Sequence, residues 1–316
     1  MERRFLDFLK LAVRAQKPRT RGLTIIGEDG QPIPWIREML EAWGEYVDGV
    51  KFNLTHIYMP WRVVEAKVKL YREFNVFVAL DDPTFAVAYY QGKAKELLQT
   101  VRDLGFTHVQ VDTQHVDLGS HADTKKERED EAYYMALARE LGLRLEGEVG
   151  HKYSEGDRSR TQDGLLSVEF IVAEMKRLLA AGCDHVTLES RVIRTAIGSH
   201  GEKEQGTAQI RQIANLIGQD NIFIEITRQL PFDTQQCHRF WAVRNFGPDV
   251  NIGGSMSITD VRYLEAVRRG TTFVNVPSRS SSALWIMSLA RNHRLPPENW
   301  WKDEIQIDPE LFGKSA

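Results

Sequence analysis

Cysteine is scarce in this chain, with only Cys183 and Cys237 among 316 residues. The two lie far apart, inside segments that we expect to be regular elements, so the sequence supports neither a disulfide framework nor a cysteine-based metal site. Sparse, unpaired cysteine is typical of a reducing compartment. We therefore expect a cytoplasmic protein.

Long apolar runs are also missing, and the amino terminus mixes acids and bases. Neither a signal peptide nor a membrane span is expected, and Phe5–Ala15 is predicted to form an amphipathic helix. No charge of one sign dominates, since the formal net charge is -3 at pH 7, and no basic stripe interleaves with aromatic residues. Nucleic acid and membrane partners are therefore not expected.

Eight short apolar segments recur along the chain, each followed by a segment of helix length. The predicted strands are Leu23–Gly27, Val47–Asn53, Val76–Asp82, His108–Thr113, Arg144–Gly150, His185–Ser190, Ile222–Thr227 and Asp249–Gly254. Alternation of strands and helices predicts a parallel sheet, and eight repeats match a closed (β/α)8 barrel. A doubly wound open sheet is the alternative, but the first turn, Gly27–Gly30, lacks the glycine-rich pattern that such sheets usually carry.

The chain is thus interpreted as one α/β domain, a (β/α)8 (TIM) barrel over residues 1–270 that includes the N-terminal helix. Residues 271–316 carry Trp285, Trp300 and Trp301 among prolines, which is too aromatic for a free linker. We expect them to form a C-terminal extension packed on the barrel or on a neighbouring subunit. The aromatic tail is one reason to expect a homo-oligomer.

Charged side chains end most of the predicted strands, at the rim where the active sites of such barrels lie. They are Lys51, Asp81, Asp82, Asp112, Glu148, Glu189, Arg191, Glu225 and Arg228. The connections that leave this rim are expected to be long, notably His151–Leu166 and Arg191–Gln205. The returns to the next strand are expected to be short, with helix ends at Gly105, Gly142, Gly182 and Gly247.

Six carboxylates around one barrel mouth would repel one another unless positive charge balances them. Salt bridges with Lys51, Lys152, Arg191 and Arg228 are one possible balance. The other is a hard divalent cation held by oxygen ligands, with Mg²⁺ favoured over zinc because no paired histidines occur at a strand end. The candidate metal ligands are Asp112, Glu148, Glu189 and Glu225.

The last predicted strand ends in a segment that could bind an anion. Gly253 and Gly254 would let a ligand approach the backbone, and the helix that follows would offer free N–H groups, although a plain turn explains the glycines equally well. Asn251, Gly253, Gly254 and Ser255 are therefore candidate contacts of a small anionic substrate. The same rim adds His151, Arg228, Asp81 and Asp82 as candidate substrate contacts.

Seven stretches in fixed order carry a resemblance to a known family. They are Arg21–Thr24, Tyr46–Phe52, Glu148–Lys152, Glu189–Arg191, Gln235–Gln236, Val250–Asn251 and Leu264–Gly270. From about Arg21 to Gly270 the chain resembles the phosphosulfolactate synthases of coenzyme M biosynthesis. The resemblance implies a (β/α)8 barrel that uses Mg²⁺ to add sulfite to phosphoenolpyruvate, a small phosphorylated acid. A metal and cations would stabilise the aci-carboxylate formed, before a lysine protonates the carbon.

The resemblance also implies residue roles. The position of the family's general acid matches Lys152, which makes Lys51 an electrostatic partner. Glu148 and Arg191 complete the catalytic set that the resemblance implies. It also implies a homo-oligomeric enzyme.

Several turns depart from the family pattern. The family's glycine-rich turn after the second strand reads Asn53–His56 here, and its Gly-Gly-Thr after the third strand reads Asp81–Thr84. His151–Lys152 replaces two lysines, and Ser190–Arg194 keeps an arginine but lacks one glutamate. The two aspartates place negative charge where an anionic substrate would approach.

Two alternatives to the family's activity therefore stay open. The chain is either a divergent barrel enzyme that acts on a different small acid, or a non-catalytic relative of the family. A simpler interpretation of Asp82 is that it caps the turn before Pro83 and points away from the substrate.

Overall fold

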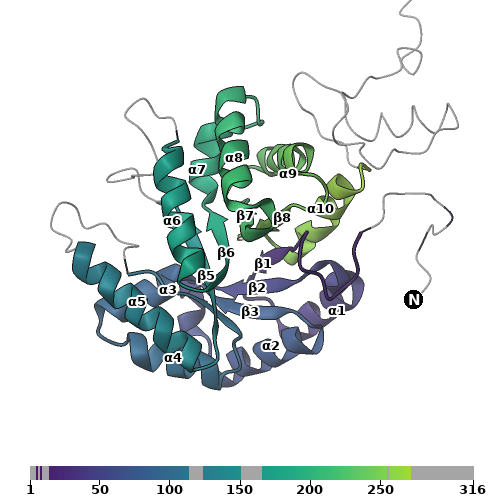
Figure 1. Cartoon of the computed structure of the whole chain (residues 1–316). Helices are drawn as coiled ribbons and strands as arrows, with labels where there is room; N and C mark the ends of the chain where they lie inside the picture. Colours follow the sequence, from purple (N-terminus) through teal and green to yellow (C-terminus); the bar gives the residue numbers. More distant parts are fainter. Residues whose placement is uncertain are drawn as a thin grey trace, which may run out of the picture.

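The computed structural model describes residues 14–113, 124–150, 166–254 and 256–271, together with Phe5 and Phe8. Its eight strands are parallel, and each pairs with the next along the chain (Figure 1). The first and last strands meet at a parallel bridge between Thr24 and Ile252, and Ile252 N donates to Leu23 O at 2.9 Å. The predicted (β/α)8 barrel is confirmed. The open doubly wound sheet is wrong, because its strand order would reverse.

All eight predicted strands are present, and most are shorter than predicted at their carboxyl ends. Their bounds are β1 (Ile25–Gly27), β2 (Gly49–Phe52), β3 (Phe77–Leu80), β4 (His108–Gln110), β5 (Arg144–Val149), β6 (Cys183–Leu188), β7 (Ile222–Glu225) and β8 (Asn251–Gly253). Residues at the rim leave the sheet because they cap helices or form turns. Glu189, for example, caps a helix instead of ending β6.

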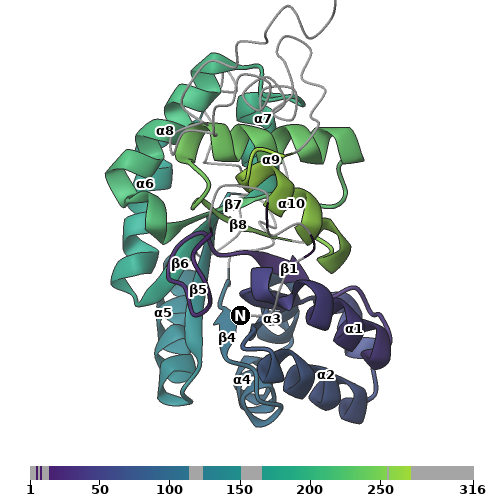
Figure 2. The same cartoon turned by 90° about the vertical axis from the view of Figure 1, so that its right-hand side faces the viewer.

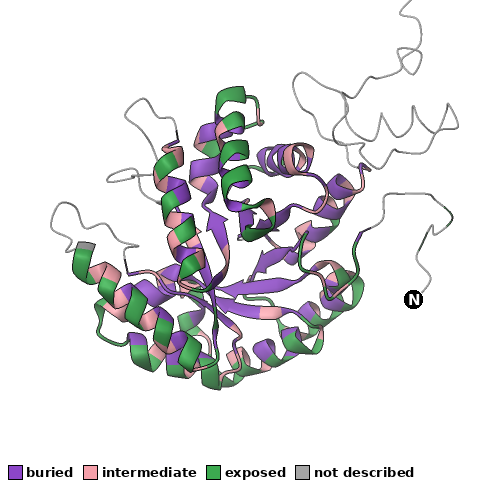
Figure 3. Cartoon of the chain, in the orientation of Figure 1, coloured by how far each residue is buried: buried purple, intermediate pink, exposed green. Residues whose placement is uncertain are grey.

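Helices surround the strands (Figures 1 and 2). Their bounds are α1 (Ile33–Trp43), α2 (Trp61–Glu73), α3 (Asp82–Tyr90), α4 (Ala94–Asp103), α5 (Thr124–Glu140), α6 (Val168–Ala180), α7 (Ser190–Ile197), α8 (Glu204–Ile217), α9 (Phe232–Phe246) and α10 (Val261–Arg268). Strands and the inner helix faces are buried, and the outer faces are exposed (Figure 3). In α6 the buried positions Ile171, Met175 and Leu178 repeat every three or four residues and so form one apolar stripe.

The buried side chains inside the barrel change from apolar to polar and charged along the barrel axis. Toward the amino ends of the strands, Leu23, Ile25 and Phe223 form a small apolar cluster with Phe77 packed against it. Closer to the carboxyl ends, the buried side chains are polar or charged, among them Lys51, Gln110, Glu146 and Thr187. The apolar cluster lies below a charged upper layer, which faces the rim where the chemistry is expected.

One predicted loop is wrong. Arg191–Gln205 is not an extended connection, because residues 191–197 belong to α7 and α8 begins at Glu204. Glu189 caps α7 through the backbone N–H groups of Arg191 and Val192. Burial of Val192, Ile193 and Ile197 then stabilises the helix against the barrel.

Other predictions have mixed outcomes. Gly105, Gly142, Gly182 and Gly247 all have positive φ angles after a helix, as predicted. Cys183 and Cys237 are free and buried. Most of the predicted N-terminal helix and the C-terminal extension beyond residue 271 lie outside the described residues. Among the described residues, no helix is both long and apolar enough to span a membrane.

The two described residues that end the predicted N-terminal helix, Arg14 and Ala15, are not helical. The guanidinium of Arg14 is buried and holds the chain against the barrel. It donates to Gly22 O at 2.9 Å and lies 3.2 Å from the carboxylate of Glu265. These contacts favour an irregular segment that leads into β1.

Candidate active site

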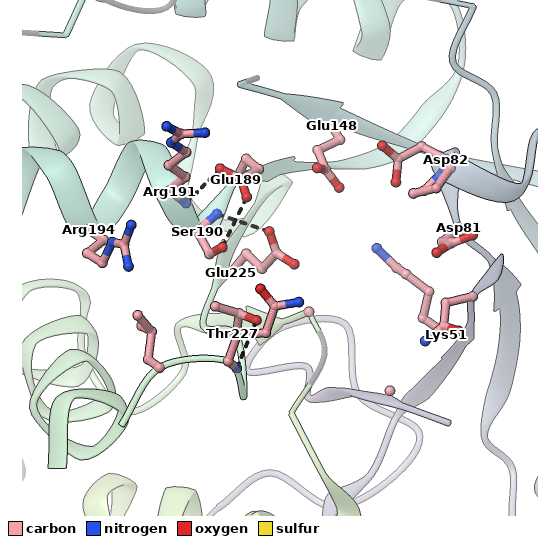
Figure 4. A pocket seen from close by; sticks show the side chains of 16 residues that line it. Lys51, Asp81, Asp82, Glu148, Glu189, Ser190, Arg191, Arg194, Glu225 and Thr227 are labelled. Carbon is pink, nitrogen blue, oxygen red and sulfur yellow. Dashed lines mark hydrogen bonds between the residues drawn. The ribbon is translucent and has the colours of Figure 1, made fainter. Parts of the chain in front are cut away.

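A cavity of about 590 Å³ opens at the carboxyl ends of the strands. Its described lining is Gly27, Lys51, Asn53, Asp81, Asp82, Pro83, Glu148, Glu189, Ser190, Arg191, Arg194, Glu225, Thr227, Gln229, Leu230 and Gly254. Strands β1, β2, β5 and β7 and helices α3 and α7 all contribute to it. Figure 4 shows Arg191 and Arg194 on one side, Lys51 on the opposite side, and carboxylates between them.

Lys51 is the buried cation of the site. It lies on β2 with a side chain that is 11% exposed, and its Nζ is 4.0 Å from a carboxylate oxygen of Glu146. Burial by itself lowers the pKa of Lys51, but Glu146, Glu148, Glu225 and Asp82 outweigh it, so the pKa lies above its usual value. Lys51 is thus a fixed positive charge facing the cavity.

The two aspartates after β3 have different surroundings. Asp81 is the N-cap of α3, and its carboxylate accepts a hydrogen bond from Thr84 N at 3.1 Å. Asp82 is the first residue of that helix, and its backbone N–H donates to Gln110 Oε1 at 3.3 Å. Both line the cavity, and both are buried. The capping role predicted for Asp82 therefore belongs to Asp81.

Two carboxylates are engaged by the start of α7. Glu189 accepts hydrogen bonds from Arg191 N at 2.6 Å and Val192 N at 3.3 Å. Glu225 accepts one from Ser190 N at 3.0 Å (Figure 4). These N–H groups are the ones that a helix offers to an anion. Because carboxylates already occupy them, an anionic ligand on this side would have to be recognised by the Arg191 and Arg194 side chains.

Glu148 connects the cavity to a smaller recess. It accepts a hydrogen bond from Gln110 Nε2 at 3.3 Å, and like Asp82 it lines both spaces. The recess, about 80 Å³, lies beside β4, β5 and α6. Asp112 lines the recess and is not among the described residues of the main cavity. The four predicted metal ligands therefore divide between the two spaces, with Glu148 common to both.

No cluster of three or more histidine, cysteine, aspartate or glutamate side chains suited to a metal ion occurs in the described part of the chain. Of the predicted ligands, Glu189 caps α7. Glu148 and Glu225 both face the cavity centre (Figure 4). Within the described lining, these two carboxylates are the groups best placed to hold a cation there.

Of the three described substrate contacts predicted at the end of β8, only Gly254 lines the cavity. Gly254 lines the cavity with a φ of 111°, and a Cβ there would lie 2.4 Å from Glu225 Cγ, so only glycine fits. Asn251 instead accepts from Leu23 N and donates to Asp220 O, each at 2.9 Å, and thus joins strands. Gly253 packs against Phe223. Neither of these two belongs to the described lining.

Arg228 forms an ion pair with Asp29, in the loop after β1. This pair joins the loops that follow β1 and β7 across the rim of the barrel. Arg228 is likewise not in the described lining. Direct substrate contact by Arg228 stays a prediction. His151, Lys152 and Ser255 lie outside the described residues.

The structure adds residues that the sequence reading did not select. They are Asn53, Gln110, Glu146, Arg194, Thr227 and Gln229. A signal existed for Glu146, because Arg144, Glu146 and Glu148 alternate along one strand and must share a face. Arg194 lies one helical turn after Ser190, but that spacing is informative only once residues 190–197 are known to be helical.

Comparisons with known proteins agree on one family. The sequence model of (2R)-phospho-3-sulfolactate synthase (ComA) matches residues 12–273. A phosphosulfolactate synthase from Methanothermobacter thermautotrophicus is 28% identical over 271 residues, covering 84% of this chain and 94% of that protein. The one from Methanocaldococcus jannaschii is 26% identical, covering 79% of this chain and 92% of that protein. The one from Bacillus subtilis is 26% identical, covering 84% of this chain and 96% of that protein.

Proposed function

Because the chain belongs to the (2R)-phospho-3-sulfolactate synthase family, we propose that it forms a carbon–sulfur bond by adding sulfite to phosphoenolpyruvate. The relatives that carry the name phosphosulfolactate synthase support this reaction class. The observation that carries the proposal is the cavity itself, where Lys51 faces Arg191 and Arg194 across a space of about 590 Å³. Cations on opposite sides suit a substrate with separated anionic groups.

The proposed reaction balances without an oxidant or reductant. The sulfur lone pair of sulfite forms a bond to C3 of phosphoenolpyruvate, and the C2–C3 π electrons move onto C2 and its carboxylate. A proton then adds to C2, which gives phosphosulfolactate with the phosphate still attached. The charge that develops on the carboxylate is what positive groups must stabilise.

Residues of this chain take separate parts in the proposal. Lys51 supplies a fixed positive charge deep in the site, in keeping with its raised pKa. Arg191 and Arg194 bind an anionic group of the substrate from the α7 side. Lys152 donates the proton, an assignment that rests on the family resemblance alone. For His151, the neighbour of Lys152 in the sequence, we propose a substrate contact.

Mg²⁺ is the proposed cofactor, and two carboxylates of the described lining are suitable ligands for it. Mg²⁺ commonly uses one or two protein carboxylates together with water and substrate oxygens. Glu148 and Glu225 face the cavity and would hold it. When bound, it would neutralise negative charge on the substrate and on the cavity wall.

The test is direct. Purified protein is incubated with phosphoenolpyruvate, sulfite and Mg²⁺, and phosphosulfolactate is followed by phosphorus NMR and mass spectrometry. Product that depends on all three components is the expected result. A matched reaction with EDTA in place of Mg²⁺ should stay near the uncatalysed rate.

A second candidate function is a related reaction on a different small acid. It is favoured by the charge of the described cavity lining, where Asp81, Asp82, Glu148, Glu189 and Glu225 outnumber Lys51, Arg191 and Arg194. Such a wall repels a dianion unless a cation intervenes. Rapid phosphosulfolactate formation would remove this candidate. Slow or undetectable formation, together with stabilisation by another small acid in a thermal-shift screen, would establish it.

A further inference from the structure

We propose that Glu146 is a positioning residue for Lys51: its buried carboxylate holds the ammonium group from below the cavity and sets how far that group reaches toward the substrate. The part of this inference that concerns turnover rests on the proposed function. The part that concerns the Glu146–Lys51 contact does not.

The placement of Glu146 is set by the strand. Side chains of a strand alternate between its two faces, so Glu146 and Glu148 share a face, whereas Gly147 packs its backbone toward Leu178 of α6. Glu148 is at the cavity, and Glu146 is one layer deeper. Glu146 pairs in register with Gln110 of β4, inside the barrel. It is 4% exposed.

Lys51 Nζ, 4.0 Å away, is the nearest cation to the Glu146 carboxylate in the described structure. Neither carboxylate oxygen of Glu146 has a hydrogen-bond partner among the described residues. A buried carboxylate without hydrogen bonds costs free energy, so its position needs a compensating interaction. Burial raises the pKa of the Glu146 carboxyl, and the ammonium group of Lys51 is the strongest interaction that opposes this rise.

Glu146 differs from the other acids near Lys51 in its access to ligands. Asp82, Glu148 and Glu225 line the cavity, so a substrate or a bound cation can change their charge balance. Glu146 lines only the recess, which shares Asp82 and Glu148 with the cavity, and it is not among the described lining residues of the cavity itself. A ligand in the cavity therefore lies nearer to Lys51 than to Glu146. Lys51 can then interact with two negative groups at once, the carboxylate of Glu146 below the cavity and an anionic substrate inside it.

This arrangement predicts opposite effects on binding and on turnover. Glu146→Gln removes one negative charge beneath the cavity while nearly preserving side-chain volume. An anionic substrate should then bind more tightly, with KM lowered about threefold, because the potential at the cavity becomes more positive. The kcat should fall about tenfold or more, because Lys51 is no longer held at its working position. Loss of a purely structural residue would raise KM and lower stability.

Controls separate this role from general charge removal. Glu131 is also 4% exposed and lines the recess, but its partner is Arg177, not Lys51. Glu131→Gln should leave both kinetic constants near wild type. Glu146→Asp keeps the charge and should retain at least half of the wild-type kcat. If Glu146→Asp loses as much kcat as Glu146→Gln, or if Glu146→Gln raises KM without lowering kcat, the proposal is overturned.

A second measurement needs no substrate. Urea unfolding midpoints are compared for the wild type, Lys51→Met, Glu146→Gln and the double variant. If the two groups hold each other, the double variant is less destabilised than the sum of the single variants. Strict additivity overturns the contact whatever the activity assay gives. Non-additivity without any phosphosulfolactate formation would instead retain the contact and reject the proposed reaction.

Discussion

At the scale of single residues, the use of each carboxylate depends on which N–H groups lie beside it. Asp81 and Glu189 both follow a strand and both cap a helix, so their oxygens are directed to backbone donors. All four line the cavity, but only Glu148 and Asp82 also line the recess. Residues of the same type at equivalent strand ends therefore have different chemistry.

The first prediction concerns Mg²⁺. Glu148→Gln and Glu225→Gln should each weaken Mg²⁺ binding about tenfold or more in calorimetric titration, because each removes a charged oxygen ligand from the cavity. Glutamine at position 225 can still accept from Ser190 N, so the start of α7 is preserved. Asp112→Asn is the matched variant in the recess and should bind Mg²⁺ as the wild type does. Unchanged binding in both glutamine variants would remove the proposed site.

The second prediction concerns Asp82. Asp82→Asn should tighten the binding of phosphoenolpyruvate by about tenfold, because one negative charge facing the cavity is lost. Titration calorimetry without sulfite measures this directly. Asp103→Asn, at the exposed end of α4 and outside the described cavity lining, is the control and should bind phosphoenolpyruvate as the wild type does. Equal affinity of the wild type and Asp82→Asn would mean that Asp82 does not face the substrate.

The third prediction concerns Lys152. Lys152→Met should lower kcat about a hundredfold or more with KM nearly kept, the usual consequence of losing a general acid. Lys51→Met should instead affect KM as well, because Lys51 lies in the cavity wall as a charge. Full turnover by Lys152→Met would show that this residue is not the proton donor.

At the scale of elements, α7 is the segment that organises one side of the site. It is only eight residues long, yet it places Ser190, Arg191 and Arg194 on the cavity. Its start is fixed by Glu189 from its own chain segment and by Glu225 from β7. The positions of both arginines thus depend on two acidic caps.

The fourth prediction tests these caps. Glu189→Ala should lower the free energy of unfolding by about 1 kcal/mol, the usual cost of losing an N-cap, and should raise KM because Arg191 and Arg194 lose their fixed positions. Glu189→Gln keeps an acceptor and should recover at least half of the lost stability. Chemical denaturation and steady-state kinetics measure the two effects. A loss of stability with KM unaltered would show that the cap of α7 does not contribute to substrate binding.

At the scale of the whole molecule, charged side chains lie at both ends of the barrel. At the carboxyl end, acidic side chains, one lysine and two arginines line the described part of the cavity. The amino end buries His108 against Phe77, with ring centroids 4.4 Å apart. Burial and Arg144 lower the pKa of His108, Asp184 opposes them, and the net result is about 3, against an ordinary value of 6.5.

The fifth prediction follows from that shift. Between pH 6.5 and 3 the unfolded chain binds a proton at His108 that the folded chain does not, so stability rises with pH there and falls on acidification. The contribution of His108 is about 1.4 kcal/mol per pH unit. His108→Gln should therefore show a shallower loss of stability from pH 6 to 4 in urea denaturation. Replacement of the exposed His200 by Gln is the control. Parallel wild-type and His108→Gln profiles would contradict the assignment.

Local patterns in the sequence were sufficient for the architecture. The spacing of apolar residues distinguishes strands from helices. Parallel strands in a closed barrel then place all their carboxyl ends on one rim. That logic identified Lys51, Asp81, Asp82, Glu148, Glu189 and Glu225, all of which line the cavity. The family resemblance pointed to the same family as the later match over residues 12–273.

Only the tertiary structure decided what each of these groups contacts. Whether Glu189 caps a helix, whether Arg228 pairs with Asp29, and whether Glu146 meets Lys51 all depend on residues brought together from distant strands. Hydrogen bonds and ion pairs act over a few ångströms, and sequence spacing fixes such distances only within one element. The sequence by itself therefore determined the barrel and its active rim, whereas the packing of strands around a closed ring decided the charge balance of the site.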